Sequence, residues 1–172
     1  MEFRAKSKET KGWVFGPGVF VGPYEVTMVP DKCAYQTKEE QHSYIFNSFG
    51  AKEEVVTDTI GRCTEYTDNN HVKIYEGDIV NIKYRNSDIT YKGGVVKFGE
   101  YKLSRYDEFP RYLGYYIVVD KLVAPFIPLI DVGEVMLDNK ISLSLLDVIY
   151  NGEVKVIGNV FDNPTLLELN DE

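Results

Sequence analysis

Two carboxylates separated by one residue, Glu76 and Asp78, are the first side chains whose types and spacing could support chemistry. Side chains at positions i and i+2 lie on the same side of an extended chain, so this pair could act in acid–base catalysis or bind a metal ion. Either role needs further ligands from elsewhere in the chain. We favour the simpler interpretation that Gly77-Asp78 forms a turn before a strand, in which the Asp78 carboxylate binds nearby backbone N–H groups.

The polar segment Asp68-Asn69-Asn70 is similar to the start of a calcium-binding loop. A calcium loop needs oxygen ligands at its fifth and twelfth positions, and here Val72 and Ile79 occupy those positions. The ligand pattern therefore fails, and we predict that this segment is a turn.

The two histidines, His42 and His71, have no His, Cys or carboxylate at a spacing that recurs in metal sites. No nucleophile elbow or dinucleotide fingerprint accompanies them. Gly16-Pro17-Gly18 is predicted to be a turn, because Pro17 lacks an N–H group that a phosphate would need. We therefore expect that the protein is not an enzyme, and we assign no catalytic, cofactor-binding or metal-binding residue and no cofactor.

Composition indicates a packed globular protein, since 44% of its 172 residues are hydrophobic and its formal net charge is −8. Such acidity argues against a general affinity for nucleic acid.

Cys33 and Cys63 stand far apart, so we favour two reduced thiols over a disulfide. The N-terminus carries charges but no apolar stretch, so we expect a cytoplasmic protein without a membrane partner.

Residues 83–112 interleave aromatic and basic side chains, which permits two interpretations. In one, the aromatic side chains face inward and the cations face outward, as in any amphipathic strand. In the other, this surface binds nucleic acid by stacking and phosphate contacts. We favour the first because the net charge opposes the second. The residues concerned are Lys83, Arg85, Lys92, Lys97, Lys102, Arg105 and Arg111, with Tyr84, Tyr91, Phe98, Tyr101, Tyr106, Phe109 and Tyr112.

Many short apolar segments, separated by Gly, Pro and Asn, predict a mainly β fold. Residues 38–49 could hold one or two helical turns, although several polar residues weaken that alternative. A short helix is predicted over 142–150, with Ser142 or Ser144 as its cap and Gly152 near its end. Asn163 is predicted to cap a last helical turn that begins at Pro164.

Two motifs resemble the YopX family of phage and prophage proteins. The first runs through Thr59-Ile60-Gly61-Arg62-Cys63-Thr64 and Asp68 to Ile74-Tyr75-Glu76-Gly77-Asp78-Ile79-Val80. The second is Val156-Ile157-Gly158-Asn159-Val160-Phe161-Asp162-Asn163-Pro164-Thr165-Leu166-Leu167, and Phe3-Arg4-Ala5 resembles the family's opening. The motif residues that we expect to form structural turns are Asp68, Tyr75, Glu76, Gly77, Asp78, Gly158, Asn159, Asn163 and Pro164.

The chain departs from the family at several positions. Lys6 replaces a Trp, and Glu65-Tyr66 replaces a Gly-Leu pair. His71 stands where the family has a turn glycine, so Asn70 or His71 must adopt a positive φ, or the loop must open. Residues 99–140 contain no family landmark.

The resemblance implies a phage or prophage origin and a small Src-homology-3-like barrel in the C-terminal part. It also implies an irregular β-rich N-terminal subdomain and a few short helices. We expect a subdomain over residues 1–58 and a barrel subdomain over 59–172. The family supplies no activity.

The function predicted from the sequence is therefore that of a phage accessory protein that binds rather than catalyses, through self-association and contacts with another protein. Its predicted interface lies in the apolar strip 122–130, where flanking prolines prevent regular burial. The residues of this interface are Phe126, Ile127, Leu129 and Ile130. The alternative function is that of a small nucleic-acid-binding barrel.

Overall fold

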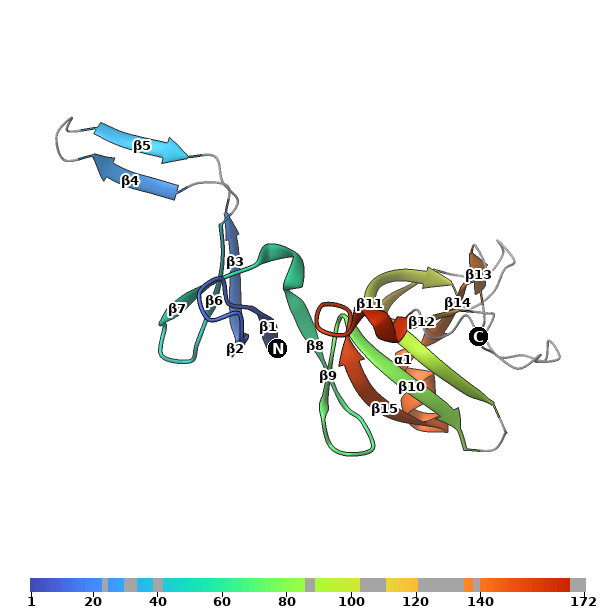
Figure 1. Ribbon diagram of the computed structural model, residues 1–172. Coiled ribbons are helices and arrows are strands. Elements are labelled where there is room, and N and C mark those ends of the chain that lie inside the picture. Colours follow the sequence, from blue (N-terminus) through green and yellow to red (C-terminus); the bar gives the residue numbers. More distant parts are fainter. Residues whose placement is uncertain are drawn as a thin grey trace. The chain divides into compact units, whose positions relative to one another are not determined.

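The computed structural model describes residues 1–22, 25–29, 34–38, 42–85, 89–102, 111–120, 135–137 and 140–167. The chain divides into two compact units, Met1–Cys63 and Thr64–Glu172 (Figure 1). This division falls within strand β8 (Gly61–Thr67), a few residues after the boundary predicted between residues 58 and 59. The mainly β class predicted from the sequence is confirmed, since antiparallel sheets dominate the described residues.

The N-terminal unit is built from short antiparallel strands. One set pairs β1 (Phe3–Lys6) with β2 (Trp13–Gly16) and with the first residues of β8. A second sheet has the order β3-β6-β7, formed by β3 (Gly18–Gly22), β6 (His42–Phe46) and β7 (Lys52–Val55). The hairpin of β4 (Glu25–Val29) and β5 (Ala34–Lys38) and the 3-10 helix η2 (Thr57–Thr59) complete it.

Strand β6 occupies residues 42–46, so the helical turns considered for residues 38–49 are wrong there, and residues 39–41 lie outside the described residues. Its side chains alternate between two faces, with Ser43 and Ile45 buried and Tyr44 and Phe46 half-buried. Its backbone pairs with β3 on one side and with β7 on the other, which satisfies its hydrogen-bonding groups without a helix. Tertiary pairing has thus overridden a weak local preference.

The C-terminal unit contains a six-stranded antiparallel sheet of order β13-β14-β12-β11-β10-β15. Its strands are β10 (Asp78–Tyr84), β11 (Thr90–Lys102), β12 (Arg111–Asp120), β13 (Val135–Leu137), β14 (Lys140–Ser144) and β15 (Gly152–Asn159). β9 (Lys73–Tyr75) lies beside β8. The two edge strands of the sheet, β13 and β15, do not pair with each other in the described residues, where no closed barrel is found.

The predicted short helix is confirmed as α1 (Leu145–Asn151), which begins after Ser144 and ends at Gly152. The Ser144 side chain accepts a hydrogen bond from the Asp147 N–H, as an N-cap does. Leu145 and Val148 of α1 are fully buried in the core of the C-terminal unit. The last helical turn is the 3-10 helix η4 (Pro164–Leu167).

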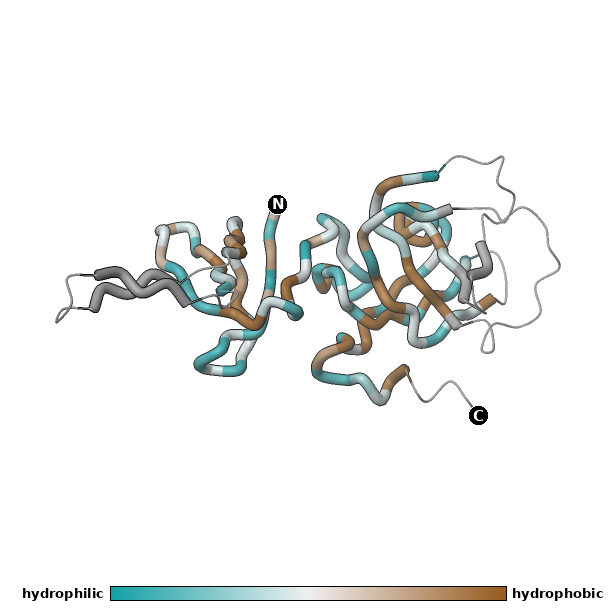
Figure 2. The backbone as a smooth tube through the Cα atoms, turned by 90° about the horizontal axis from the view of Figure 1, so that it is seen from above, coloured by the Kyte–Doolittle hydropathy of each residue, from teal (hydrophilic) through white to brown (hydrophobic). Residues whose placement is uncertain are grey.

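Each unit has its own apolar core, and Figure 2 shows apolar and polar stretches alternating along the chain in both. The N-terminal core consists of Ala5, Ile45 and Val55, with Phe3, Val14, Val19 and Ile60 packed against it. The C-terminal core consists of Ile74, Val80, Ile82, Tyr91, Val96, Ile117, Val119, Leu143, Leu145, Val148 and Val154. Burial of these side chains is the main stabilising contribution in each unit.

Candidate functional site

The turn that carries Glu76 and Asp78 is held by its own carboxylate. Asp78 is 1% exposed, and its Oδ2 accepts a hydrogen bond of 2.7 Å from the Tyr75 N–H. Gly77 has a φ of 84°, which favours glycine, and its N–H donates to the Val96 carbonyl at 2.9 Å. Glu76 is half-buried in the same turn. Asp78 therefore binds backbone, as the simpler interpretation of this pair predicts.

Asp68 closes the polar turn that follows β8. Its Oδ1 accepts hydrogen bonds from the N–H groups of Asn70, at 2.8 Å, and Val72, at 2.9 Å. His71 has a φ of 62°, so it adopts the positive φ that the missing glycine would otherwise supply. The segment is a turn, as predicted.

The same turn covers the outer edge of β15. The second carboxylate oxygen of Asp68 accepts from the Val156 N–H at 3.1 Å. Asn69 binds Val154 twice, because its N–H donates to the Val154 carbonyl at 3.0 Å and its Oδ1 accepts from the Val154 N–H at 2.7 Å. Two side-chain oxygens and one backbone N–H of the turn thus take the place of a neighbouring strand, which protects an edge that could otherwise pair with another chain.

The second motif forms a compact loop after β15. Asn159 Oδ1 accepts from the N–H groups of Phe161, at 3.0 Å, and Asp162, at 2.9 Å, and its Nδ2 donates to Asp162 Oδ2 at 3.0 Å. Asn163 closes the loop, since its N–H donates to the Asn159 carbonyl at 2.9 Å. A Cβ at Gly158 would lie 2.5 Å from Asn163 Oδ1, so this position has no room for a side chain.

Asn163 stands at the cap position of η4, but its side chain points back into the loop. Its carbonyl accepts the first hydrogen bond of the turn, 3.1 Å from the Leu166 N–H, as a cap residue's does. Its Oδ1 accepts from the Asn159 N–H at 3.3 Å. Asn163 therefore occupies the predicted cap position through its backbone carbonyl, whereas its side-chain amide oxygen binds the preceding loop.

The two family motifs meet at one end of the six-stranded sheet. Asp78 lies opposite Asn159 in the pairing of β10 with β15, and the Val160 N–H donates to the Gly77 carbonyl at 3.0 Å. The buried polar side chains Asp68, Asp78 and Asn159 each bind backbone N–H groups. The motifs thus join distant strands of the fold.

A polar cluster that the sequence did not predict lies in the N-terminal unit. Glu54 Oε1 lies 2.6 Å from Lys8 Nζ and 2.7 Å from His42 Nδ1. The hydrogen bond from Lys8, and then that from His42, holds the pKa of the Glu54 carboxyl below its usual value. The residues that meet here are far apart in sequence, so only the pairing of β6 with β7 and the fold of the N-terminus reveal the cluster.

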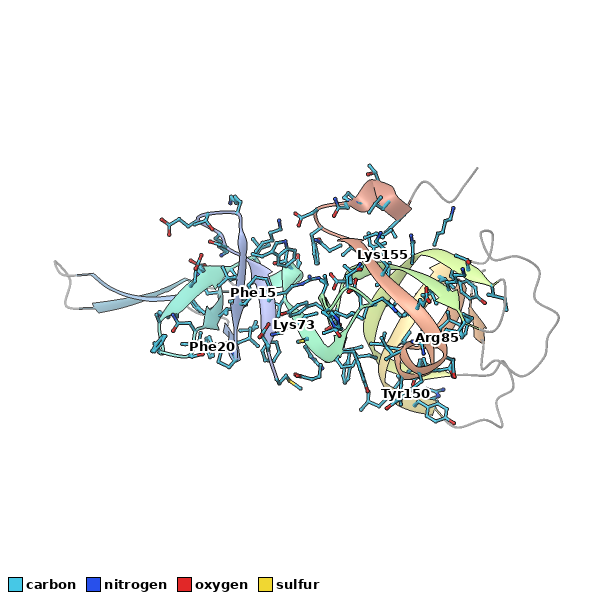
Figure 3. The ribbon with its side chains drawn as sticks, turned by 90° about the horizontal axis from the view of Figure 1, so that it is seen from below. Phe15, Phe20, Lys73, Arg85, Tyr150 and Lys155 are labelled. Carbon is cyan, nitrogen blue, oxygen red and sulfur yellow. The ribbon has the colours of Figure 1, made fainter. Side chains whose placement is uncertain are left out.

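Exposed apolar side chains gather on β2 and β3 of the N-terminal unit. Phe15 is 49% exposed, Phe20 is 54% exposed and Val21 is 46% exposed. Figure 3 marks Phe15 and Phe20 on these consecutive strands. Both strands are edge strands in the described sheets.

Cys63 is buried on β8, whereas Cys33 lies outside the described residues. The strip 122–130, with Phe126, Ile127, Leu129 and Ile130, also lies outside them. Within the described ranges, no three His, Cys, Asp or Glu side chains are grouped as metal ligands would be, and no helix is long and apolar enough to cross a membrane.

Fold and motifs together define a mainly β protein whose two sequence motifs join the strands of one sheet. The family described as YopX protein matches residues 2–114, about two thirds of the chain, and the chain belongs to this family. The matched residues include the first motif but not the second. Membership indicates a phage-type protein and assigns no activity. No curated protein and no solved structure matches the chain.

Proposed function

We propose that this YopX-family protein is a phage accessory protein of the host cytoplasm that works by binding other proteins, beginning with a second copy of itself, and not by catalysis. One observation carries the proposal. Two consecutive edge strands of the N-terminal unit, β2 and β3, present large apolar side chains to solvent. The backbone N–H groups bound by Asp68 and Asp78 give further support, because these two carboxylates serve the fold.

One face of strand β3 packs against the N-terminal core, and the other face is open to solvent. Val19 packs against the N-terminal core, so the next side chain, Phe20, points away from that core. Opposite Phe20 in the register lies Tyr44, over whose ring Lys52 Nζ stands 4.5 Å from the centroid. Phe20 therefore belongs to an outward aromatic surface.

An edge strand beside exposed apolar side chains is a site at which proteins associate. The outer edge of such a strand offers backbone N–H and C=O groups to another strand, and apolar side chains add the burial that holds the pair. A second copy supplies the same strand, so a symmetric antiparallel pairing of β3 with β3 meets both requirements. The proposed interface is defined as Phe15, Phe20 and Val21.

Light scattering over a concentration series tests self-association. We expect the wild type to show a mass above that of the monomer at about 10–100 µM, in the range of weak specific association. Phe20→Asp should return it to the monomer with its thermal midpoint unchanged, because Phe20 lies outside the core. Phe49→Asp is the matched control, since Phe49 is 97% exposed in the turn after β6 and should not affect the mass.

A wild type that remains monomeric at these concentrations contradicts the proposal. If Phe20→Asp still associates and Phe126→Asp does not, self-association occurs through the strip 122–130 instead. Equal loss of association in Phe20→Asp and Phe49→Asp would show that the charge alone, not the edge strand, is responsible.

A further inference from the structure

The six-stranded sheet has a second face, which points away from its core and carries basic side chains. Val80 and Ile82 of β10 and Tyr91 and Val96 of β11 face the core, so the side chains next to them that are exposed, Lys83, Lys92 and Lys97, face outward. A bulge sets Lys92 and Gly93 of β11 opposite Asn81 of β10, and the Gly93 N–H donates to Asn81 Oδ1 at 3.1 Å. The exposed outward lysines, here called the basic face, are Lys83, Lys92, Lys97 and Lys155.

Register places these lysines on three adjacent strands. Lys155 of β15 lies opposite Asn81, and Lys83 lies opposite Glu153. Lys97 lies further along β11, opposite Tyr116 of β12. Among the described outward side chains of β10, β11, β12 and β15, Glu153 is the one acid. The face is therefore locally positive in a chain of net charge −8.

Beyond Lys97, the same face carries a row of tyrosines. Tyr101 lies opposite Tyr112, and their ring centroids are 5.8 Å apart. Tyr101 and Tyr116 are stacked, with centroids 5.3 Å apart and an interplanar angle of 22°. Tyr112 is 41% exposed, so its ring is accessible from solvent. Tyr101, Tyr112 and Tyr116 thus form a tyrosine row on this face.

Two glycines lie between the tyrosines on these strands. Gly99 and Gly114 are paired, and a Cβ on either would meet a tyrosine ring, Tyr116 at 3.9 Å or Tyr101 at 3.7 Å. The rings thus lie over backbone that has no side chain. The Tyr101 hydroxyl, 3.4 Å from Ser144 Oγ, fixes one ring further. Tyr101 is the middle ring of the row, so a further planar group could stack on the outer face of Tyr112 at its end.

The partner of this face must match both of its chemical features. Lysines attract a polyanion, and flat aromatic rings stack with the bases of a nucleic acid. The carboxylates of an acidic peptide would pair with the lysines but would not stack on the tyrosines. A duplex keeps its bases stacked inside, so it would meet the lysines alone. A single strand presents phosphates and unstacked bases together.

We propose that the outward face of β10, β11, β12 and β15 binds single-stranded nucleic acid. The phosphates lie along Lys83, Lys92, Lys97 and Lys155, and a base stacks on Tyr112 at the end of the tyrosine row. This inference is independent of the proposed self-association, which uses the N-terminal unit. The interpretation favoured from sequence placed the aromatic side chains of residues 83–112 inward and the cations outward. In the structure Tyr91 faces inward, whereas the tyrosine row faces outward with the lysines.

Fluorescence anisotropy with labelled single-stranded oligo-dT and oligo-rU of about 20 nucleotides tests the electrostatic part. We expect saturable binding at low salt that weakens as salt is raised. For the double variant Lys92→Ala, Lys97→Ala, the slope of log affinity against log salt should fall by about 1.4, since each phosphate contact with a single strand contributes about 0.7. Lys11→Ala with Lys52→Ala removes the same charge from exposed sites in the N-terminal unit and should leave the slope unchanged.

Tyr112→Leu tests the stacking part separately. We expect affinity to fall about tenfold with the salt slope unchanged, because a stacked base is lost while the phosphate contacts remain. Tyr150→Leu is the matched control: Tyr150 is 70% exposed on α1, where Figure 3 marks it. Its affinity should equal that of the wild type.

Three results would overturn the inference. Absence of saturable binding to both oligonucleotides at low salt refutes it outright. If Lys92→Ala with Lys97→Ala and the control variant weaken binding equally, the oligonucleotide responds to the total charge of the protein and not to this face. Duplex binding as tight as single-strand binding, unaffected by Tyr112→Leu, would refute stacking. Circular dichroism of each variant ensures that lost binding is not lost folding.

Discussion

Asp68 and Val156 are joined by a hydrogen bond of 3.1 Å between a carboxylate oxygen and a backbone N–H, although 88 positions separate them in sequence. Asp68 lies in the first family motif and Val156 begins the second. The other oxygen of Asp68 accepts from Asn70 and Val72, so one side chain closes a turn and covers the edge of β15. A motif that reads as a calcium-like turn thus stabilises a sheet.

Asp68→Ala should lower the free energy of unfolding by about 2–3 kcal/mol. The substitution leaves three backbone N–H groups without their carboxylate, and Asp68 is 4% exposed, so water replaces it poorly. Asp68→Asn keeps one acceptor oxygen and should lose about half as much. Urea denaturation measures both variants.

Asp58→Ala is the control for this series, because Asp58 is exposed in η2 and its loss should change stability by less than about 0.5 kcal/mol. Light scattering of Asp68→Ala should also reveal slow aggregation, since part of the β15 edge is uncovered. A stability equal to that of the wild type would show that Asp68 does not hold the two motifs together.

Gly158 and Asn163 should behave as a coupled pair. Gly158→Ala places a Cβ 2.5 Å from Asn163 Oδ1 and should cost about 1–3 kcal/mol of stability. Asn163→Ala loses the hydrogen bond from the Asn159 N–H and should cost about 1 kcal/mol. Together they should cost less than the sum, because the second substitution removes the atoms that the first one meets.

A double-mutant cycle by urea denaturation measures this coupling, with Asn163→Ala and Asp58→Ala, which lie in different units, as the control pair. Leu166 Cδ1 also lies 2.9 Å from the Cβ position of Gly158, so Asn163→Ala should relieve only part of the clash that Gly158→Ala introduces. Strictly additive losses would mean that the backbone has shifted and that the clash with Asn163 is not the cause.

Local sequence was sufficient to predict much of the fold. Gly77-Asp78 and Asp68-Asn70 carry turn chemistry in their own residue types, and both turns are found. Ser144 and Gly152 mark the ends of α1 in the same way. Each of these features depends on contacts within a few residues, which sequence patterns report well.

Features that depend on distant partners could not be predicted. The Asn163 side chain forms its hydrogen bond with the preceding loop, because Gly158 leaves that space open. The tyrosine row requires the register of β11 with β12, which sets Tyr101 opposite Tyr112 across the strands. Alternation alone cannot say which face of a strand is the core, so Tyr91 and Tyr101 look alike in sequence and face opposite sides.

Acid should selectively weaken the N-terminal unit through Glu54. The hydrogen bond from Lys8, and then that from His42, lowers the pKa of the Glu54 carboxyl from 4.5. The ionised Glu54 carboxylate therefore stabilises the folded unit fully above pH 4.5, and this stabilisation is lost as the pH falls through the lowered pKa of the folded state. Glu54→Gln should therefore reduce the thermal midpoint at neutral pH, and this reduction should shrink as the pH falls below 4.5. Trp13, the sole tryptophan, lies in the same unit and reports its unfolding by fluorescence. Glu53→Gln controls for the loss of a neighbouring carboxylate, and a difference between Glu54→Gln and wild type that stays constant with pH would contradict the ion-pair explanation.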